Sequence, residues 1–369
     1  MLEVAEIFRR HGAVFRARFA ATLRPVQCQA LRDIEACRTA YFGGHLKQCD
    51  HCQRQVYAYH SCRNRHCPKC HGDQTARWLA QQQPRLLPCS YFLVTFTLPA
   101  ELRPLAFAHQ KLVYGLLMRC AAAALLKLAR DPRYVGGRLG LLAVLHTWTR
   151  DLRYHPHVHM LVTGGGLALD GKTWLPAPHP NYLVPEAALA IIFRAKLCAA
   201  LNKAGLLDQV PRPVWKKNWR VNCKPAGSGR QVLNYLARYI FRVAISNSRL
   251  ERLDAGQVTF RYRDNRTQLL QRVTIPGPEF IRRFLLHILP RRCAKVRYYG
   301  LWSPTARPLL EQARALLDHA PANPASVPDA SADPAPTAPL TPAPPARCPH
   351  CHRGQLLALK VLPRQREPP

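Results

Sequence analysis

The sequence predicts an α+β fold, with a central antiparallel sheet flanked by helices and a small helical, cysteine-rich domain in front of it. Three observations favour this class. Short segments rich in β-branched and aromatic residues follow one another along the chain, and long segments of helical periodicity lie between them. Two Cys-x2-Cys pairs lie near the N-terminus, in a region with few apolar residues. At 369 residues the chain can form two or three domains.

The expected elements follow from these periodicities in chain order. Apolar residues recur three and four positions apart in the expected helices, which lie at 1–40 (two helices), 78–87, 105–129, 185–206, 231–242 and 280–288. Alternating or β-branched segments predict strands at 91–98, 141–148, 155–162, 244–246, 258–263 and 295–300. Residues 320–346 are dominated by Pro and Ala and are expected to be an extended linker.

Composition limits the partners and the compartment. The 54 Lys and Arg residues exceed the 21 Asp and Glu residues, so the formal charge is +33 and polyanions such as nucleic acids are expected to bind. The N-terminal segment is charged and amphipathic, unlike a signal peptide, so we expect a cytoplasmic protein with reduced cysteines. The most apolar segment, at 112–129, is interrupted by Arg119 and Lys127. It is therefore expected to be a buried helix and not a membrane span.

The N-terminal cysteines predict structural zinc. Their spacing allows four thiolates to close tetrahedrally around one Zn²⁺, and the expected ligands are Cys49, Cys52, Cys67 and Cys70. A second site is an open alternative for the residues left over, which are Cys37, His45, Cys62 and His66. Near the C-terminus, half a zinc knuckle or free thiols are equally compatible with Cys348, His350, Cys351 and His352.

A histidine-rich strand is the candidate site for a second kind of metal. His157 and His159 are two positions apart, so on a strand they project from the same face, opposite Val158 and Met160. Two imidazoles on a rigid strand form a preformed pair of ligands, which would hold a catalytic divalent ion.

The preceding strand can supply a third ligand. If the hairpin turn is centred between Leu152 and Arg153, His146 lies opposite His159 and shares its face. His146 is therefore the expected third ligand, with His155 and Gln231 as rivals.

The expected helix at 231–242 carries two tyrosines. Tyr235 and Tyr239 are four residues apart and therefore lie on one face of the helix. A phenol is a poor nucleophile at neutral pH, but a divalent ion can neutralise the charge of a phosphodiester and position it for attack. A histidine strand followed by such a helix is the arrangement expected of an enzyme that cuts single-stranded DNA with tyrosine.

At this point the chain resembles the transposases of the insertion-sequence 91 type, which are two-tyrosine members of the HUH endonuclease superfamily. The matching segments, in the family's order, are 61–70, 146–148, 155–159 with the glycines at 164–166, 235–239 and 244–247. The segment 61–70 resembles the family's amino-terminal zinc-binding domain. The resemblance covers roughly residues 30 to 305.

The resemblance implies an HUH-type antiparallel sheet and a specific activity. Tyr235 and Tyr239 would cleave and rejoin single-stranded DNA through 5′-phosphotyrosine intermediates, at the transposon ends and at the target, in rolling-circle-like transposition. Mg²⁺ or Mn²⁺ would be held by the histidines. Residues between the zinc ligands or beside the tyrosines are expected to contact DNA, namely Arg63, Arg65, Lys69, Arg238 and Arg242. An oligomer is compatible with the sequence.

Two alternatives remain at this stage. A plasmid replication initiator or a relaxase of the same superfamily would share the histidines and tyrosines. A non-catalytic zinc-knuckle DNA-binding regulator would use them only structurally. The expected domains are 1–75 (helical, zinc- and DNA-binding), 76–318 (catalytic), 319–346 (linker) and 347–369 (Cys/His tail).

Overall fold

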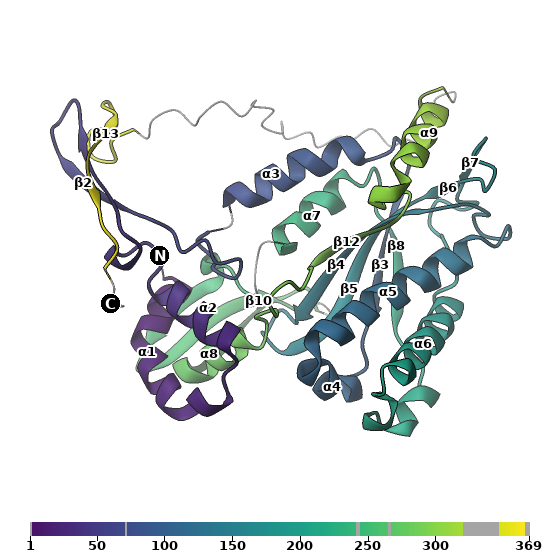
Figure 1. The fold of residues 1–369 in the computed structure, drawn as a ribbon, viewed down its shortest axis with the longest axis horizontal. Coiled ribbons are helices and arrows are strands. Elements are labelled where there is room, and N and C mark those ends of the chain that lie inside the picture. The colour runs from purple at the N-terminus through teal and green to yellow at the C-terminus, as the bar shows by residue number, and fades with distance from the viewer. Residues whose placement is uncertain (1, 71, 241–243, 265–266, 320–346, 366–369) are drawn as a thin grey trace. The chain divides into compact units, whose positions relative to one another are not determined.

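The structure is a computed structural model that describes residues 2–70, 72–240, 244–264, 267–319 and 347–365. Its contacts divide the chain into two compact units (Figure 1). One comprises the described residues of Met1–Gly72, Ile245–Ile288 and Asp329–Pro369, and the other those of Asp73–Ala244 and Leu289–Pro328. The expected linker at 320–346 lies outside the described residues. The expected domain boundaries stay a prediction, although the contacts assign 245–288 to the N-terminal unit.

A five-stranded antiparallel sheet forms the centre of the second unit, in the order β12-β4-β5-β3-β8. In chain order its strands are β3 (Tyr91–Thr97), β4 (Gly140–Trp148), β5 (Tyr154–Thr163), β8 (Val221–Pro225) and β12 (Val296–Gly300). The α+β class and the central antiparallel sheet are thereby confirmed. Because β5 lies in the middle of the sheet, its side chains are held by neighbours on both sides.

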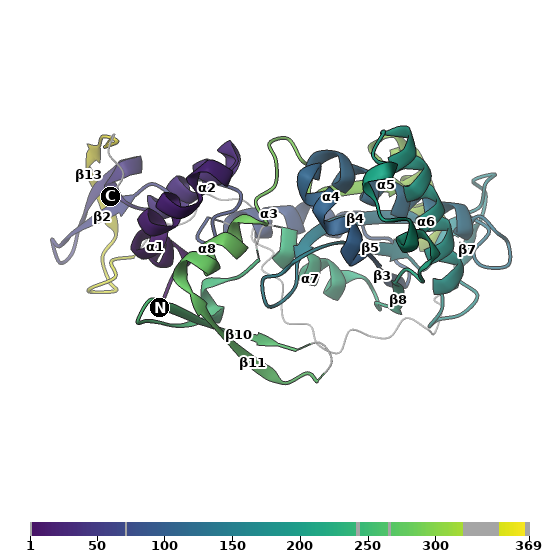
Figure 2. The same ribbon diagram turned by 90° about the horizontal axis from the view of Figure 1, so that it is seen from below.

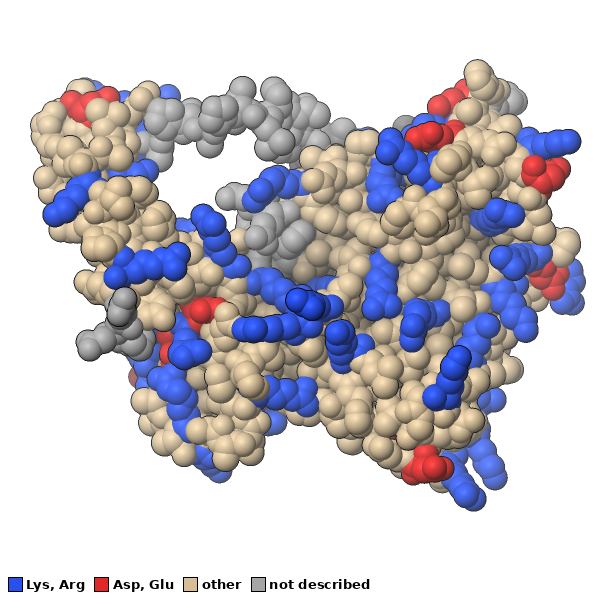
Figure 3. All heavy atoms as spheres, in the orientation of Figure 1, with Lys and Arg blue, Asp and Glu red and all other residues tan. Residues whose placement is uncertain are grey.

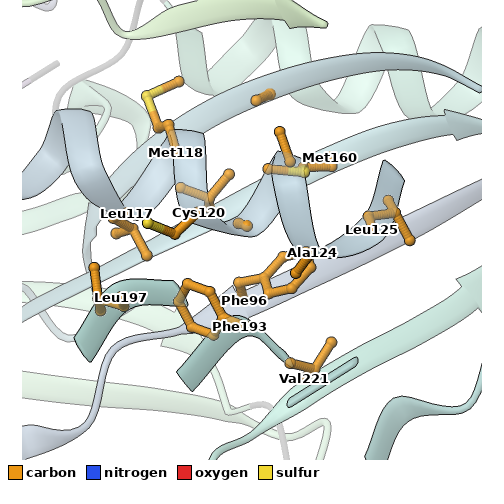
Figure 4. Packing of buried hydrophobic residues seen from close by; sticks show 14 of the residues in the cluster. Phe96, Leu117, Met118, Cys120, Ala124, Leu125, Met160, Phe193, Leu197 and Val221 are labelled. Atoms are coloured by element: carbon orange, nitrogen blue, oxygen red, sulfur yellow. The ribbon is translucent and has the colours of Figure 1, made fainter. Parts of the chain in front are cut away.

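One face of this sheet packs against apolar helices (Figures 1 and 2). These are α4 (Arg103–Ala108), α5 (Gln110–Ala129) and α6 (Glu186–Lys203). Val158 and Met160 of β5 are buried in this core, in which Phe96 contacts Phe193 edge-on with ring centroids 5.1 Å apart (Figure 4). Burial of such side chains contributes roughly 1.5–3 kcal/mol each. The apolar face of β5 is thus anchored, as its alternation predicts.

The opposite face of the sheet has its own core cluster. Leu142, Val144 and Leu161 pack there with Leu233 and Leu236 of one helix. The helices that contribute to this cluster are α3 (Gly72–Gln82), α7 (Arg230–Ile240) and α9 (Arg307–Asp318). Residues of β5 alternate between the two faces, so α7 covers the face from which the histidines project.

The first unit combines helices with two small sheets. Its helices are α1 (Val4–Phe19), α2 (Pro25–Glu35) and α8 (Gly277–Leu285). One sheet contains β9 (Leu250–Asp254), β10 (Gln257–Arg263) and β11 (Leu270–Pro276), and the other has the order β13-β1-β2, from β1 (Gly44–Cys49), β2 (Gln55–Tyr59) and β13 (Leu356–Leu362). The last of these strands comes from the C-terminal end of the chain.

The remaining elements are short. A two-stranded ribbon follows the central hairpin and consists of β6 (Gly165–Leu167) and β7 (Trp174–Pro176). The 3-10 turns are Ala20–Thr22, Ala40–Phe42, Gln83–Arg85, Ala100–Leu102, Leu207–Gln209, Arg212–Lys216, Asn247–Arg249 and Pro304–Ala306.

The structure corrects several expected elements. The helix expected at 105–129 is divided at His109, whose backbone leaves the helical region at φ −116° and ψ 46°. The strand expected at 244–246 is wrong, since Ala244 has φ 54° and β9 begins only at Leu250. Eight strands were not expected from the sequence, namely β1, β2, β6, β7, β8, β9, β11 and β13.

The helix α5 is the one described helix that is long and apolar enough to cross a membrane by composition. Most of that segment is buried inside the protein, where Leu117, Ala121 and Leu125 belong to the main core cluster. It is therefore a core helix, as the charges at Arg119 and Lys127 suggest.

Candidate active site and metal centres

The central hairpin positions three histidines. His146 of β4 lies directly opposite His157 of β5, and Val144 lies opposite His159. The expected pairing of His146 with His159 is wrong by two residues. The turn is centred about one residue earlier than expected, since the backbone N–H of Thr149 donates to the carbonyl of Arg153 at 3.0 Å. A shift of two positions keeps every side chain on its face, so the three histidines still converge.

The three imidazoles form a compact cluster. One nitrogen from each of His146, His157 and His159 lies within 4.8 Å of the others. The ring centroid of His146 is 4.4 Å from that of His159 and 5.2 Å from that of His157. His155 lies outside the cluster and is contacted by Arg103, whose Nη2 donates to its Nδ1 at 2.7 Å. The third candidate ligand is therefore His146 by geometry.

Hydrogen bonds fix the orientation of two of the rings. Nδ1 of His157 donates to the backbone carbonyl of His155 at 2.7 Å, and Nδ1 of His159 lies 2.9 Å from Oγ1 of Thr95 on β3. A proton on Nδ1 leaves Nε2 as the metal-binding atom, which is how ligand histidines are commonly held. Thr95 could not be identified from the sequence, because its role depends on the pairing of β3 with β5.

Burial keeps the imidazoles neutral. It is the main cause that holds the pKa of His146 and of His157 well below the usual value. Repulsion between the charged forms of neighbouring histidines lowers both pKa values further, and Lys295 adds to this at His146. Burial also lowers the pKa of His159 to about 4, and burial with the Arg103 charge lowers that of His155 to about 4. Since only a neutral imidazole can bind a metal, the cluster is in its ligand form at neutral pH.

Two further side chains support His146. Its ring stacks on Trp148, with centroids 5.2 Å apart and an interplanar angle of 14°, and Nζ of Lys295 lies 4.8 Å from the Trp148 ring centroid. Trp148 lies in the segment 146–148 that supports the family resemblance, whereas no local sequence pattern connects Lys295 with His146. Together they restrict the ring of His146 and place a positive charge near the cluster.

Tyr235 of α7 faces the cluster. Its ring centroid lies 6.4 Å from that of His159, and the two rings are nearly perpendicular, at 85°. Tyr239 follows on the same helix, but its side chain and that of Arg238 lie outside the described residues, as does Arg242. Gln231 is exposed at the start of α7 and stays a candidate for an additional ligand.

The cysteines form two clusters, not the single expected site. In the first, four sulfurs lie within 4.8 Å of one another, contributed by Cys37, Cys62, Cys67 and Cys70. In the second, the same holds for Cys49, Cys52, Cys348 and Cys351. The expected quartet is thus divided, because its two Cys-x2-Cys pairs belong to different clusters. Four sulfurs at a Zn–S distance of about 2.3 Å are separated by about 3.8 Å, and Cys37 and Cys62 each lie 3.6 Å from Cys70.

The two histidines of the alternative second site contact other side chains and not a cysteine cluster. His66 is buried beside its own hydrogen-bond partner Asn64, with Nδ1 3.2 Å from Oδ1. The ring of His45 contacts that of His60, with centroids 5.0 Å apart. Neither belongs to a described four-residue metal cluster.

The expected DNA contacts around the first cysteine cluster differ in exposure. Arg63 and Arg65 are exposed, and Lys69 is half-buried and forms an ion pair with Glu3. Lys and Arg side chains are spread over the face seen in Figure 3, where Asp and Glu are few. This distribution agrees with the formal charge of +33.

Comparisons with known proteins define the class. A family described as "Transposase zinc-binding domain" matches residues 7–98, and one described as "Putative transposase" matches residues 140–308. The protein is thus a transposase, an enzyme that processes DNA, with a zinc-binding domain at its N-terminal end.

Two relatives specify the family. The chain is 40% identical to "Putative transposase y4qJ" of Sinorhizobium fredii, over 100% of this chain and 97% of that protein. It is 30% identical to the transposase for insertion sequence element IS801 of Pseudomonas savastanoi pv. phaseolicola, over 75% of this chain and 70% of that protein. No solved structure matches significantly. The chain belongs to the insertion-sequence 91 family of transposases.

Proposed function

We propose that this transposase cleaves and rejoins single-stranded DNA through a 5′-phosphotyrosine intermediate on Tyr235, in rolling-circle-like transposition. The observation that carries the proposal is the position of the Tyr235 ring 6.4 Å from His159, at the edge of a three-histidine cluster. Neither feature alone requires catalysis. A nucleophile beside a set of neutral metal ligands is the combination that phosphodiester cleavage needs.

The cluster fits a divalent metal ion. His146, His157 and His159 each offer one nitrogen within 4.8 Å, and their burial favours the neutral form. When bound there, Mn²⁺ or Mg²⁺ would supply positive charge to a phosphate oxygen and leave part of its coordination shell for the substrate. Three imidazoles favour Mn²⁺ over Mg²⁺.

Tyr235 is proposed to act as the nucleophile. The phenol gives its proton to solvent as its oxygen attacks the scissile phosphorus, the bond from phosphorus to the 3′-oxygen breaks, and the 3′-oxygen takes a proton from solvent to become a free hydroxyl. The energy of the phosphodiester is kept in the phosphotyrosine, so a 3′-hydroxyl of another strand can reverse the step without ATP. A second link on Tyr239 would allow donor and target strands to be held together.

Other parts of the chain would guide the DNA. Arg63 and Arg65 are exposed beside the first cysteine cluster, where phosphate contacts would position the strand without reading its sequence. The excess of positive charge predicts binding that weakens steeply with salt. A protein that acts on insertion sequences is expected to work in the cytoplasm.

Adduct formation tests the proposal. Purified protein is incubated with short single-stranded oligonucleotides carrying candidate end sequences and Mn²⁺, and the products are separated on a denaturing gel. We expect a covalent protein–DNA adduct from the wild type and none from the Tyr235→Phe, Tyr239→Phe double variant. Tyr182→Phe is the matched control, because Tyr182 is an exposed tyrosine of the same unit.

Two outcomes would contradict the proposal. If the double variant forms as much adduct as the wild type, another residue is the nucleophile. If no adduct forms while the double variant still supports transposition, the histidines and tyrosines are structural, as in a zinc-knuckle DNA-binding regulator.

A further inference from the structure

We propose that the C-terminal end of the chain closes a second zinc site with the N-terminal hairpin, so that the protein holds two structural zinc ions. The ligands are two Cys-x2-Cys pairs about 300 positions apart, Cys49 with Cys52 and Cys348 with Cys351. The matched zinc-binding family covers residues 7–98 and so contains only the first pair. This site depends on neither the histidine cluster nor the tyrosines.

The sulfur positions fit one tetrahedral ion. Sγ of Cys49 lies 3.6 Å from Sγ of Cys351, and Sγ of Cys52 lies 3.6 Å from Sγ of Cys348. All four sulfurs lie within 4.8 Å of one another. Zinc bound to four thiolates at about 2.3 Å requires separations of about 3.8 Å. No disulfide links the described cysteines, so all four thiols are available to bind the ion.

Backbone N–H groups are directed at three of these sulfurs. Cys52 N–H donates to Sγ of Cys49, His350 N–H to Sγ of Cys348, and Gly354 N–H to Sγ of Cys351, each at 3.4 Å. Amide dipoles pointing at sulfur stabilise the thiolate, which is the form that binds zinc. Both pairs therefore have the local backbone of a zinc knuckle, an observation independent of the sulfur spacing.

The two knuckles also contact each other closely. Oδ1 of Asp50 accepts a hydrogen bond from the N–H of Gln355 at 2.8 Å, and the N–H of Asp50 donates to the carbonyl of Gln355 at 3.1 Å. A Cβ at Gly354 would overlap with the sulfur of Cys49, so the absence of a side chain there permits the approach. Arg54 Nη1 lies 3.0 Å from Nδ1 of His350.

The strand that follows continues this contact. β13 pairs antiparallel with β1 from Leu356 opposite Cys49 to Leu362 opposite Gly44. β1 thereby becomes the central strand of a three-stranded sheet. An isolated hairpin is marginally stable in water, whereas a third strand and a bound metal stabilise it. The C-terminal strand is thus a structural part of the zinc-binding unit.

Zinc content and cysteine protection test the inference on the full-length protein. We expect Cys348→Ser, Cys351→Ser to contain one zinc ion fewer per chain than the wild type. The control Cys28→Ser, a cysteine of the same unit outside both clusters, should keep the wild-type zinc content. Zinc per chain is measured by elemental mass spectrometry after dialysis against a weak chelator.

Alkylation identifies the partners. In the wild type, Cys348 and Cys351 should resist N-ethylmaleimide, and in Cys49→Ser, Cys52→Ser they should react as fast as in the metal-free protein. In the matched variant Cys62→Ser, Cys70→Ser, which removes half of the first cluster, they should stay protected. Because peptide mapping reads each cysteine separately, partial unfolding elsewhere does not obscure the result.

Either of two results would overturn the inference. One is an unchanged zinc content in Cys348→Ser, Cys351→Ser. The other is rapid alkylation of Cys348 and Cys351 in the zinc-loaded wild type. Both leave the adduct experiment unaffected, since that experiment reads the tyrosines.

Discussion

The histidine cluster and the cysteine clusters differ in the number of protein ligands that they offer to a metal ion. Each cysteine cluster brings four sulfurs together, which can complete the coordination of zinc, whereas the histidine cluster offers three nitrogens and faces the ring of Tyr235. A site with four protein ligands has no position for a substrate, but a site with three leaves positions open. The same chain thus separates metal used for folding from metal proposed for chemistry.

The elements that carry the ligands also differ between the two kinds of cluster. The histidines lie on two adjacent inner strands of a sheet whose core consists of apolar side chains, and Val158 and Met160 anchor one of those strands. The first cysteine cluster lies mainly in loops between Cys37 and Cys70, where few side chains are fully buried. Loss of metal should therefore unfold one region and only inactivate the other.

The largest expected effect is on the first cysteine cluster. Cys67→Ser, Cys70→Ser should unfold the loops that carry this cluster, around Cys37 and at 60–70, because structural zinc contributes on the order of 10 kcal/mol to folding. Hydrogen exchange of backbone amides measures this, with Cys28→Ser as control. Unchanged protection of these loops in the double variant would mean that they fold without the zinc site.

Removal of the histidine ligands should abolish cleavage without unfolding the protein. His157→Ala, His159→Ala should lower the rate of oligonucleotide cleavage by about 10³-fold or more, since transition-state charge is no longer neutralised. The protection of the cysteine segment should not change. The control is His179→Ala, an exposed histidine of the same unit. Comparable cleavage by the double variant would exclude a catalytic ion at this cluster.

A smaller effect is expected at Thr95, which contacts Nδ1 of His159. Thr95→Val keeps the shape of the side chain but loses the hydroxyl, and should weaken Mn²⁺ binding by about 10-fold, as is typical for partners of metal ligands. Thr95→Ser should restore binding because it keeps the hydroxyl. Titration calorimetry measures both, and equal affinities for Val and Ser would show that the contact does not orient the ring.

The smallest expected effect concerns the pH dependence of Mn²⁺ affinity, which should be shifted to acidic pH. Burial lowers the pKa of His159 to about 4 from its usual 6.5, so protons compete with the ion only near pH 4. Mn²⁺ affinity should stay nearly constant from pH 7.5 to about pH 5 and then fall. In the metal-free protein, stability should decrease as the pH falls from about 6.5 towards 4, because the unfolded chain binds protons first. A tenfold loss of affinity between pH 7 and 6 would contradict this.

The sequence was most informative about secondary structure, where the spacing of apolar residues along a short segment indicates a strand or a helix. The strands near 91–98, 141–148 and 155–162 and the helix around Tyr235 were predictable, because alternation and helical spacing are properties of neighbouring residues. The convergence of His146, His157 and His159 followed from side-chain parity, which survived a pairing error of two residues. That error came from the turn, where Leu152 adopts φ 67°.

The sequence was least informative where partners are distant. The spacing of Cys49, Cys52, Cys67 and Cys70 suggested one site, but cysteine pairing cannot be deduced from spacing alone. The true neighbours of Cys49 and Cys52 come from the C-terminal end of the chain. Thr95 and Lys295 likewise depend on strand pairing and on contacts between distant segments, which no local pattern contains.

The most direct measurement is the location of the covalent link. The adduct formed with a single-stranded oligonucleotide and Mn²⁺ is digested with protease and nuclease, and the peptide that carries a 5′-phosphonucleotide is sequenced by mass spectrometry. The account predicts the modification on Tyr235, with its yield lost in His157→Ala, His159→Ala. A modification on a residue outside the helix α7, or one that forms equally without the histidines, would contradict it.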